Sequence, residues 1–169
     1  MRFSAAIVLV AGVLAAAVPN ACLSPSDADS LVKVYRDLIA AYDPAVADKY
    51  LADNFIEYSD SINILAGMPL GSPTFPSKDV FKQVQSVNPP FPLAVEKVTG
   101  VACNTISLIW SGAFGQAAKS VRGITVITAA KKDGAKGCWK ISRLDVEFNS
   151  IAWLEDEGGS YQLPPRPTA

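Results

Sequence analysis

Apolar residues recur at helical spacing in the first half of the chain. A Ser-Pro-Ser-Asp sequence at positions 24–27 is typical of a capped helix start with proline in the first turn. Six residues then form one stripe over three turns: Leu31, Val34, Tyr35, Leu38, Ile39 and Tyr42. This spacing predicts an amphipathic helix that ends at Asp43-Pro44. The same Asp43 can cap a second, shorter helix through Leu51.

Shorter elements are expected between these helices and residue 92. Phe55 to Tyr58 are typical of a short strand, and the Gly-, Pro- and Ser-rich stretch 59–77 predicts an ordered loop. Ser77 is expected to cap a third helix, which the sequence Asn88-Pro89-Pro90 ends. The first half of the chain is therefore mainly helical.

From Leu93 onward the pattern changes to β-branched residues interrupted by short turn sequences. It predicts four long strands, at about residues 93–102, 105–115, 120–130 and 137–153. The separators are short enough for hairpins, so consecutive strands should pair antiparallel in a meander. Past Trp153, an acidic stretch and the residues after it predict a flexible tail, with 160–169 outside the domain.

The last predicted strand contains a change of phase. Its apolar residues alternate on one face before the change and on the other face after it: Trp139, Ile141, Leu144, Val146 and Phe148. A β-bulge near Ser142 or Arg143 would bring all of them onto one face. The alternative is that both faces of this strand are partly buried.

Residues 1–21 combine one positive charge with an unbroken apolar run from Ala5 to Val18. This layout is typical of a secretory signal peptide, because a run of roughly 14 residues is short for a membrane span, which takes about 20. We expect cleavage after Ala17 or Ala21 and a secreted, extracellular protein. The remaining chain has no apolar run of such length, so no membrane span is expected.

Composition narrows the chemistry and the partners. The chain has no histidine, which excludes His-based catalytic triads and His-based zinc sites, and no metal or cofactor is expected. Loss of Arg2 with the leader leaves 14 of the 15 basic residues against 16 acidic ones, a net charge of −2. This balance argues against nucleic acid or an anionic membrane as a partner.

Three cysteines, Cys22, Cys103 and Cys138, lie beyond the apolar run. In an oxidising compartment the simplest count is one disulfide and one free thiol. The predicted strands place Cys103 and Cys138 at a common edge of the sheet, so we expect these two to pair. A bond from Cys22 to either of them is the alternative.

Several local sequences carry a family resemblance. The string YLADNFIEYSDS is similar to the helix-to-strand corner of SnoaL-like proteins, and SINILAGMPLGSPTFPSK, RGI and EFNSIAW resemble secreted fungal proteins of the nuclear transport factor 2-like superfamily. The resemblance covers about Ser26 to Gly159, within an expected domain of residues 22–159. It implies an α+β fold in which a curved antiparallel sheet wraps around about three N-terminal helices to form a cone with an internal pocket.

The resemblance also implies where chemistry would occur. The superfamily includes ketosteroid isomerases, scytalone dehydratases, SnoaL-like polyketide cyclases and binding modules, all of which use the interior of the cone. The isomerases pair a tyrosine with carboxylates, whereas the dehydratases and cyclases usually involve histidine, which this chain lacks.

Candidate catalytic residues lie at the corner after the first predicted strand. Tyr58 and Asp60, with Glu147, could supply the phenol and carboxylates of an enolisation, although Asp60 could instead form a turn. Candidate ligand-binding residues lie on faces expected to point inward or at the mouth of the cone: Tyr35, Tyr42, Tyr58, Trp110, Arg122, Glu147 and Asn149. Arg122 shares its face with Ile124, so an inward position would require a partner such as Glu147.

Two functions fit these observations. The favoured one is a secreted, non-catalytic binding protein of the fungal effector type, with a small hydrophobic molecule in the cone or a host protein on the sheet. The alternative is a small lyase or isomerase that acts on a ketone or polyketide-like substrate through Asp60 or Glu147 as base. Homodimerisation through the outer sheet face, with Thr125 and Ile127 exposed, is compatible with either.

Overall fold

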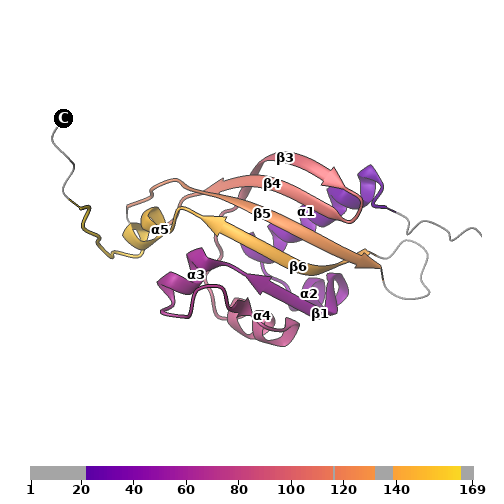
Figure 1. Cartoon of the computed structure of the whole chain (residues 1–169), viewed down its shortest axis with the longest axis horizontal. Coiled ribbons are helices and arrows are strands. Elements are labelled where there is room, and N and C mark those ends of the chain that lie inside the picture. Colours follow the sequence, from indigo (N-terminus) through magenta and orange to yellow (C-terminus); the bar gives the residue numbers. More distant parts are fainter. Residues whose placement is uncertain (1–21, 116, 132–138, 165–169) are drawn as a thin grey trace, which may run out of the picture.

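The computed structural model describes residues 22–115, 117–131 and 139–164 (Figure 1). The expected signal peptide, Cys138 and the end of the expected tail lie outside these residues. Within them, no helix is both long and apolar enough to span a bilayer.

The first two helices begin at the capping sequences. In α1 (Pro25–Ala40) the Ser24 hydroxyl accepts a hydrogen bond from the Asp27 amide at 3.2 Å, and the Asp27 carboxylate accepts one from the Ser24 amide at 3.0 Å. In α2 (Pro44–Tyr50) the Asp43 carboxylate accepts a hydrogen bond from the Ala45 amide at 2.8 Å. These bonds satisfy amides that a helix start leaves free. Both predicted helices are confirmed.

The segment expected to be a short strand and a loop contains more structure than predicted. Strand β1 runs from Leu51 to Tyr58, and the supposed loop forms helix α3 (Asp60–Leu65) and strand β2 (Pro73–Phe75) before α4 (Lys78–Gln85). The buried Asn63 side chain stabilises this segment, because its amide donates to the Ser72 carbonyl at 2.9 Å and its oxygen accepts from the Thr74 hydroxyl at 2.8 Å. Side-chain hydrogen bonds of this kind leave no trace in a hydrophobicity pattern.

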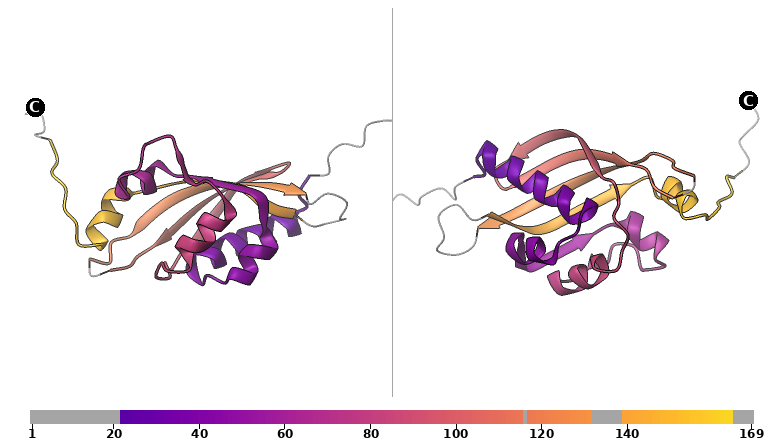
Figure 2. Two further views of the ribbon diagram at one scale, coloured as in Figure 1. Left: turned by 90° about the horizontal axis from the view of Figure 1, so that it is seen from below. Right: turned by 180° about the vertical axis from the view of Figure 1, so that it is seen from behind.

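Six strands form one sheet in the order β2-β1-β6-β5-β4-β3. The predicted antiparallel meander is confirmed as β3 (Ala94–Ala102), β4 (Thr105–Gly112), β5 (Val121–Lys131) and β6 (Trp139–Phe148). Strand β1 pairs parallel to β6, however, so the sheet is mixed rather than purely antiparallel. Helix α1 lies across its inner face, and the described helices leave much of the outer face uncovered, with α3 beside β6 (Figure 2).

The predicted bulge in β6 is confirmed at Ser142. Thr128 pairs with Arg143 and the next residue, Ala129, pairs with Ile141, so Ser142 is the extra residue. Its hydroxyl donates to the Thr128 carbonyl at 3.1 Å. The bulge brings the apolar residues before and after it onto the inner face: Trp139 and Phe148 are half-buried, and Ile141, Leu144 and Val146 are buried.

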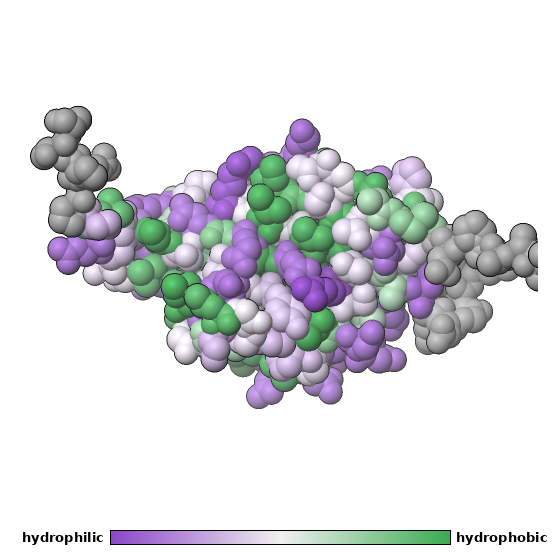
Figure 3. Space-filling model, viewed as in Figure 1, coloured by the Kyte–Doolittle hydropathy of each residue, from purple (hydrophilic) through white to green (hydrophobic). Residues whose placement is uncertain are grey.

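The two faces of β5 are the reverse of the prediction. Thr125 and Ile127 are fully buried on the inner face, whereas Arg122 is exposed and Ile124 is 55% exposed on the outer face. Apolar and β-branched residues occupy both faces of this strand, so its pattern alone did not fix which side faces α1. The outer face therefore presents a mixture of hydrophobic and hydrophilic side chains (Figure 3).

The C-terminal segment is helical where the end of the last strand, residues 150–153, and the start of a frayed tail were expected. Helix α5 (Ser150–Asp156) follows β6 directly, and the Asn149 side chain caps it by accepting a hydrogen bond from the Ala152 amide at 3.1 Å. Figures 1 and 2 show α5 at the end of the sheet opposite to the start of α1.

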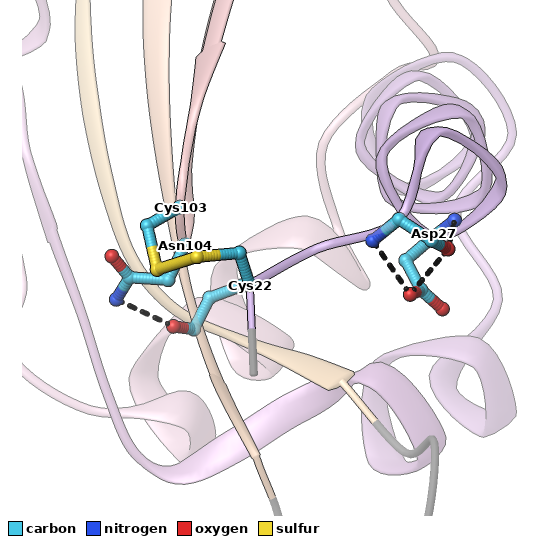
Figure 4. The surroundings of a disulfide bond; sticks show 6 residues. Cys22, Asp27, Cys103 and Asn104 are labelled. Carbon is cyan, nitrogen blue, oxygen red and sulfur yellow. Dashed lines mark hydrogen bonds between the residues drawn. A yellow bond between two sulfur atoms is a disulfide. The ribbon is translucent and has the colours of Figure 1, made fainter. Parts of the chain in front are cut away.

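The disulfide prediction named the wrong partner for Cys103. Cys103 bonds to Cys22, not to Cys138 (Figure 4). The turn between β3 and β4 carries Cys103 to the start of the described chain, where the Leu23 amide donates to the Cys103 carbonyl at 2.8 Å. The bond thus fixes the N-terminal end of α1 to the sheet.

Candidate functional site

A small polar cluster lies in the interior between α1 and the sheet. The hydroxyls of Tyr35 on α1 and Thr125 on β5 share a hydrogen bond of 2.7 Å, and the Trp110 indole on β4 donates to the Thr125 hydroxyl at 2.9 Å. All three residues are buried. Buried polar groups normally need such partners, so these bonds fix the three side chains relative to one another.

Glu57 is the acidic residue of this interior. It follows Phe55 on the inward face of β1, is only 3% exposed, and its Oε2 atom has no hydrogen-bond partner among the described residues. Burial raises the pKa of Glu57 to about 8, and the negative charge of Asp145 adds to the shift. At neutral pH the carboxyl group is therefore mostly protonated and can donate a hydrogen bond.

Glu57 acts electrostatically on the Tyr35 phenol. Burial raises the pKa of the Tyr35 phenol, and the Glu57 carboxylate raises it further, while the hydrogen bond with Thr125 acts in the opposite direction. At neutral pH the phenol is consequently protonated and the Glu57 carboxyl group is mostly protonated. The interior thus presents a neutral carboxylic acid near a neutral phenol, a pair suited to donating hydrogen bonds to an oxygen acceptor.

Sequence analysis missed Glu57. The available signal was its position two residues after Phe55, because alternate residues of a strand share a face and Phe55 belongs to the core. An acid in phase with a core residue points to a buried carboxyl group. The predicted strand was shorter, and the candidate site was placed at its end, at Tyr58 and Asp60, instead.

Of the candidate catalytic residues, Glu147 meets only the backbone amide of Asp60, while the Asp60 carboxylate and the Tyr58 ring have other partners. Glu147 is exposed, and its carboxylate accepts hydrogen bonds from the Asp60 amide at 2.8 Å, from the Ser61 amide at 3.0 Å and from the Ser61 hydroxyl. The Asp60 side chain accepts from the Gly71 amide at 2.7 Å, and the Tyr58 ring lies under the Arg143 guanidinium at 4.4 Å. These contacts hold α3 and its following turn against β6, which is a structural role.

The other candidate ligand residues are divided between the interior and the surface. Arg122 points outward and pairs with Glu96 at 3.0 Å, so the expected pairing with Glu147 was wrong. Asn149 is exposed and caps α5. Tyr42 is half-buried; burial raises its pKa, and its hydroxyl has no hydrogen-bond partner among the described residues.

An aromatic layer separates the polar cluster from α5. The Phe91 and Phe148 rings lie 5.7 Å and 6.0 Å from the Trp110 ring on one side, and 5.0 Å and 5.1 Å from the Trp153 ring of α5 on the other. Phe114 completes the layer at 4.4 Å from Trp153.

A surface groove lies between α1 and the free edge strand β3. One part measures about 210 Å³ and includes Val98 and Val101, and the adjoining part measures about 510 Å³ and includes Val95; both parts share Asp29 and Val32. The groove is open along its length and does not reach Glu57. For metal ions, the described residues hold no group of three or more His, Cys, Asp or Glu side chains suited to ligation.

Comparison with known proteins identifies the family of the fold. A family model described as "NTF2-like domain" matches residues 21–160, and no curated protein matches the chain. A SnoaL-like protein of unknown function from Burkholderia thailandensis is similar in structure, with 16% identity, a TM-score of 0.55, and coverage of 76% of this chain and 98% of that one.

Two further solved structures carry suggestions of activity. IdmH, a proposed polyketide cyclase from Streptomyces antibioticus, has 11% identity and a TM-score of 0.52, with 77% of this chain and 97% of that chain covered. A proposed isomerase of the SnoaL-like family from Agrobacterium tumefaciens has 8% identity and a TM-score of 0.51, with 73% and 98% covered. At these identities the similarity concerns the fold alone.

Proposed function

The chain belongs to the NTF2-like domain family, and on this basis we propose that it is a secreted binding protein of the fungal effector type. Its interior, between α1 and the sheet, would hold a small apolar molecule that carries a hydrogen-bond acceptor such as a ketone carbonyl. The leader-like residues 1–21 support secretion. Glu57 supports the binding function.

The observation that carries the proposal is the unpartnered carboxyl oxygen of Glu57. A buried polar group without a partner costs about 1–3 kcal/mol of stability, so its presence in the core needs an explanation. A ligand acceptor would supply the missing partner, with the aromatic layer as its apolar surroundings. The raised pKa matters here, because only the protonated acid can donate to a carbonyl.

Binding is favoured over catalysis because Glu57, the buried acid of β1, is a poor general base. A general base must be ionised at the working pH, whereas Glu57 with a pKa of about 8 is mostly protonated there. The carboxylates of Asp60 and Glu147, which the sequence suggested as bases, are exposed and occupied by backbone amides. A ligand in the interior would therefore meet hydrogen-bond donors.

A lyase or isomerase activity is the second candidate, and the same pair of residues supports it. Glu57 could act as a general acid toward a ketone oxygen while Tyr35 stabilised the resulting enol. Structural neighbours described as a proposed cyclase and a proposed isomerase make this chemistry reasonable for the fold. The base would then have to be water or the substrate itself.

A ligand titration tests the binding proposal. The probe is prodan, a neutral naphthalene ketone whose fluorescence reports on its surroundings. Glu57→Gln keeps a neutral donor and should bind prodan as the parent protein does, whereas Glu57→Leu should lose affinity by about tenfold or more, since one buried hydrogen bond is lost. Glu96→Leu, a strand glutamate on the outer face, is the matched control and should bind normally. Equal affinities for all four proteins would refute the proposed site.

Solvent deuterium exchange separates binding from catalysis. An isomerase would speed the exchange of hydrogens next to the carbonyl of a bound ketone, and Glu57→Gln would abolish this effect because an amide cannot transfer the proton. The binding proposal predicts no acceleration by either protein. N-terminal sequencing of protein recovered from the culture medium tests secretion, with Val18 or Cys22 expected as the first residue.

The outer sheet face offers a place for a protein partner. Ile124 is exposed there beside the ion pair of Arg122 and Glu96. Either a host protein or a second copy of the chain could use this face. Sedimentation of the purified protein at high concentration distinguishes the two. Self-association would raise its sedimentation coefficient without any other protein present, and Ile124→Asp should abolish this increase.

A further inference from the structure

Helix α5 packs on the aromatic layer at one end of the sheet. Its Trp153 ring covers the aromatic layer, with centroid distances of 4.4 Å to Phe114 and 5.0 Å to Phe91. Behind that layer, Trp110 donates its hydrogen bond to Thr125, which in turn bonds to Tyr35. A continuous series of contacts thus connects α5 to the polar cluster.

Specific bonds hold α5 in this position. The Asp156 carboxylate is only 4% exposed and accepts a hydrogen bond from the Lys119 amide at 2.8 Å, and the Lys119 ammonium pairs with Glu155 at 2.5 Å. At Gly115 the backbone adopts a φ of +65°, and a Cβ atom there would lie 2.0 Å from the Asp156 carbonyl oxygen. Gly115 and Lys119 therefore both lie close to the C-terminal end of α5.

The same helix is poorly stabilised by its own structure. It has seven residues, and isolated helices shorter than about 12 residues are marginal in water. Its start is anchored at Asn149, whose amide donates to the Arg122 carbonyl at 3.1 Å, while Gly158 beyond its end has a φ of +85°. The contacts at Trp153 and Asp156 thus largely decide whether α5 stays closed.

We propose that α5 is a hinged lid that controls entry to the interior, with Asp156 and Lys119 as its latch. This inference rests on the proposed binding function, and it specifies how a ligand reaches a site that the folded chain encloses. When the latch opens, α5 swings at Asn149, lifts Trp153 from the aromatic layer and exposes the way to Glu57. When it closes again, Trp153 covers the ligand.

Hydrogen exchange tests the lid without any ligand. The amides of α5 should exchange through a local opening that leaves β5 and β6 protected. Asp156→Ala removes the latch and should speed exchange in residues 150–156 by about tenfold or more, with no change in the sheet. Ile151→Ala, an exposed position on the same helix, is the matched control and should leave exchange unchanged. Glu155→Ala weakens the latch through Lys119 and should act in the same direction by a smaller factor.

Stopped-flow binding of prodan tests whether the lid controls entry. If closure only gates the site, Asp156→Ala should raise the association and dissociation rates by a similar factor of about ten and leave the dissociation constant unchanged. A residue that merely lined the site would change the dissociation constant instead.

The outcomes separate this inference from the proposed function. Exchange of α5 together with the sheet, in one cooperative event, would overturn the lid. Faster exchange in Asp156→Ala with unchanged prodan rates would also overturn it, because α5 would then open without gating the site. Failure of the parent protein to bind prodan would refute the proposed function, while the exchange data would still decide whether α5 opens by itself.

Discussion

The pH dependence of stability gives a quantitative test of the buried acid. Glu57 has an ordinary pKa of 4.5 in the unfolded chain, and burial raises it to about 8 in the folded protein. Between these values the folded protein keeps a proton that the unfolded chain has released, so the free energy of unfolding falls as pH rises. The stability associated with the protonated acid is fully present below pH 4.5 and is lost as pH passes through 8.

The magnitude follows from the two pKa values. Each pH unit between them is worth roughly 1.4 kcal/mol, so ionisation of Glu57 should cost about 5 kcal/mol once the pH exceeds 8. Glu57→Gln has nearly the same shape and never ionises. Its free energy of unfolding should therefore lie near that of the parent protein at pH 4.5 and exceed it by several kcal/mol at pH 8.5.

Urea unfolding followed by tryptophan fluorescence, at five pH values from 4.5 to 8.5, measures this difference directly. Glu147→Gln is the control: it removes an exposed carboxylate that accepts backbone hydrogen bonds, so it should lower stability without any gain at high pH. Parallel stability curves for Glu57→Gln and the parent protein would refute the reasoning, because they would mean that Glu57 titrates alike in both states.

Three further predictions concern stability. Replacing the disulfide by Cys22→Ser with Cys103→Ser frees a loop of 81 residues and should lower the free energy of unfolding by about 4 kcal/mol, measured by urea unfolding. Ser61→Ala loses hydrogen bonds to β6, including 3.0 Å bonds with the backbone of the last strand residue, and should cost about 1–3 kcal/mol, with faster exchange of the α3 amides. Gly123→Ala would place a Cβ atom 2.3 Å from the Trp110 ring and should cost about 1–3 kcal/mol, with a changed near-UV circular dichroism signal.

The sequence predicted correctly those features whose structure depends on residues close together in the chain. Ser24 and Asp43 mark helix starts because a capping side chain acts within two or three residues of itself. The bulge at Ser142 was predictable for a similar reason, since the change of phase in β6 is contained in one strand. The NTF2-like fold followed from the order of these elements and the local strings.

Features that depend on distant residues were not predictable in this way. The partner of Cys103 depends on how α1 approaches the turn after β3, which no pattern within either element records. The inward face of β5 packs against residues far away in the chain, as in the hydrogen bond between Thr125 and Tyr35, 90 positions apart. Glu57 was missed because its importance comes from what surrounds it, not from its neighbours in the chain.

The most direct test of the central claim, that a protonated Glu57 holds a ligand acceptor in the interior, is the prodan affinity of the parent protein and of Glu57→Gln at pH 6 and pH 9.5. The account predicts that the parent protein loses affinity by about tenfold or more at pH 9.5, where Glu57 is ionised, and that Glu57→Gln binds equally at both pH values. The same loss in both proteins, or no loss in either, would contradict it.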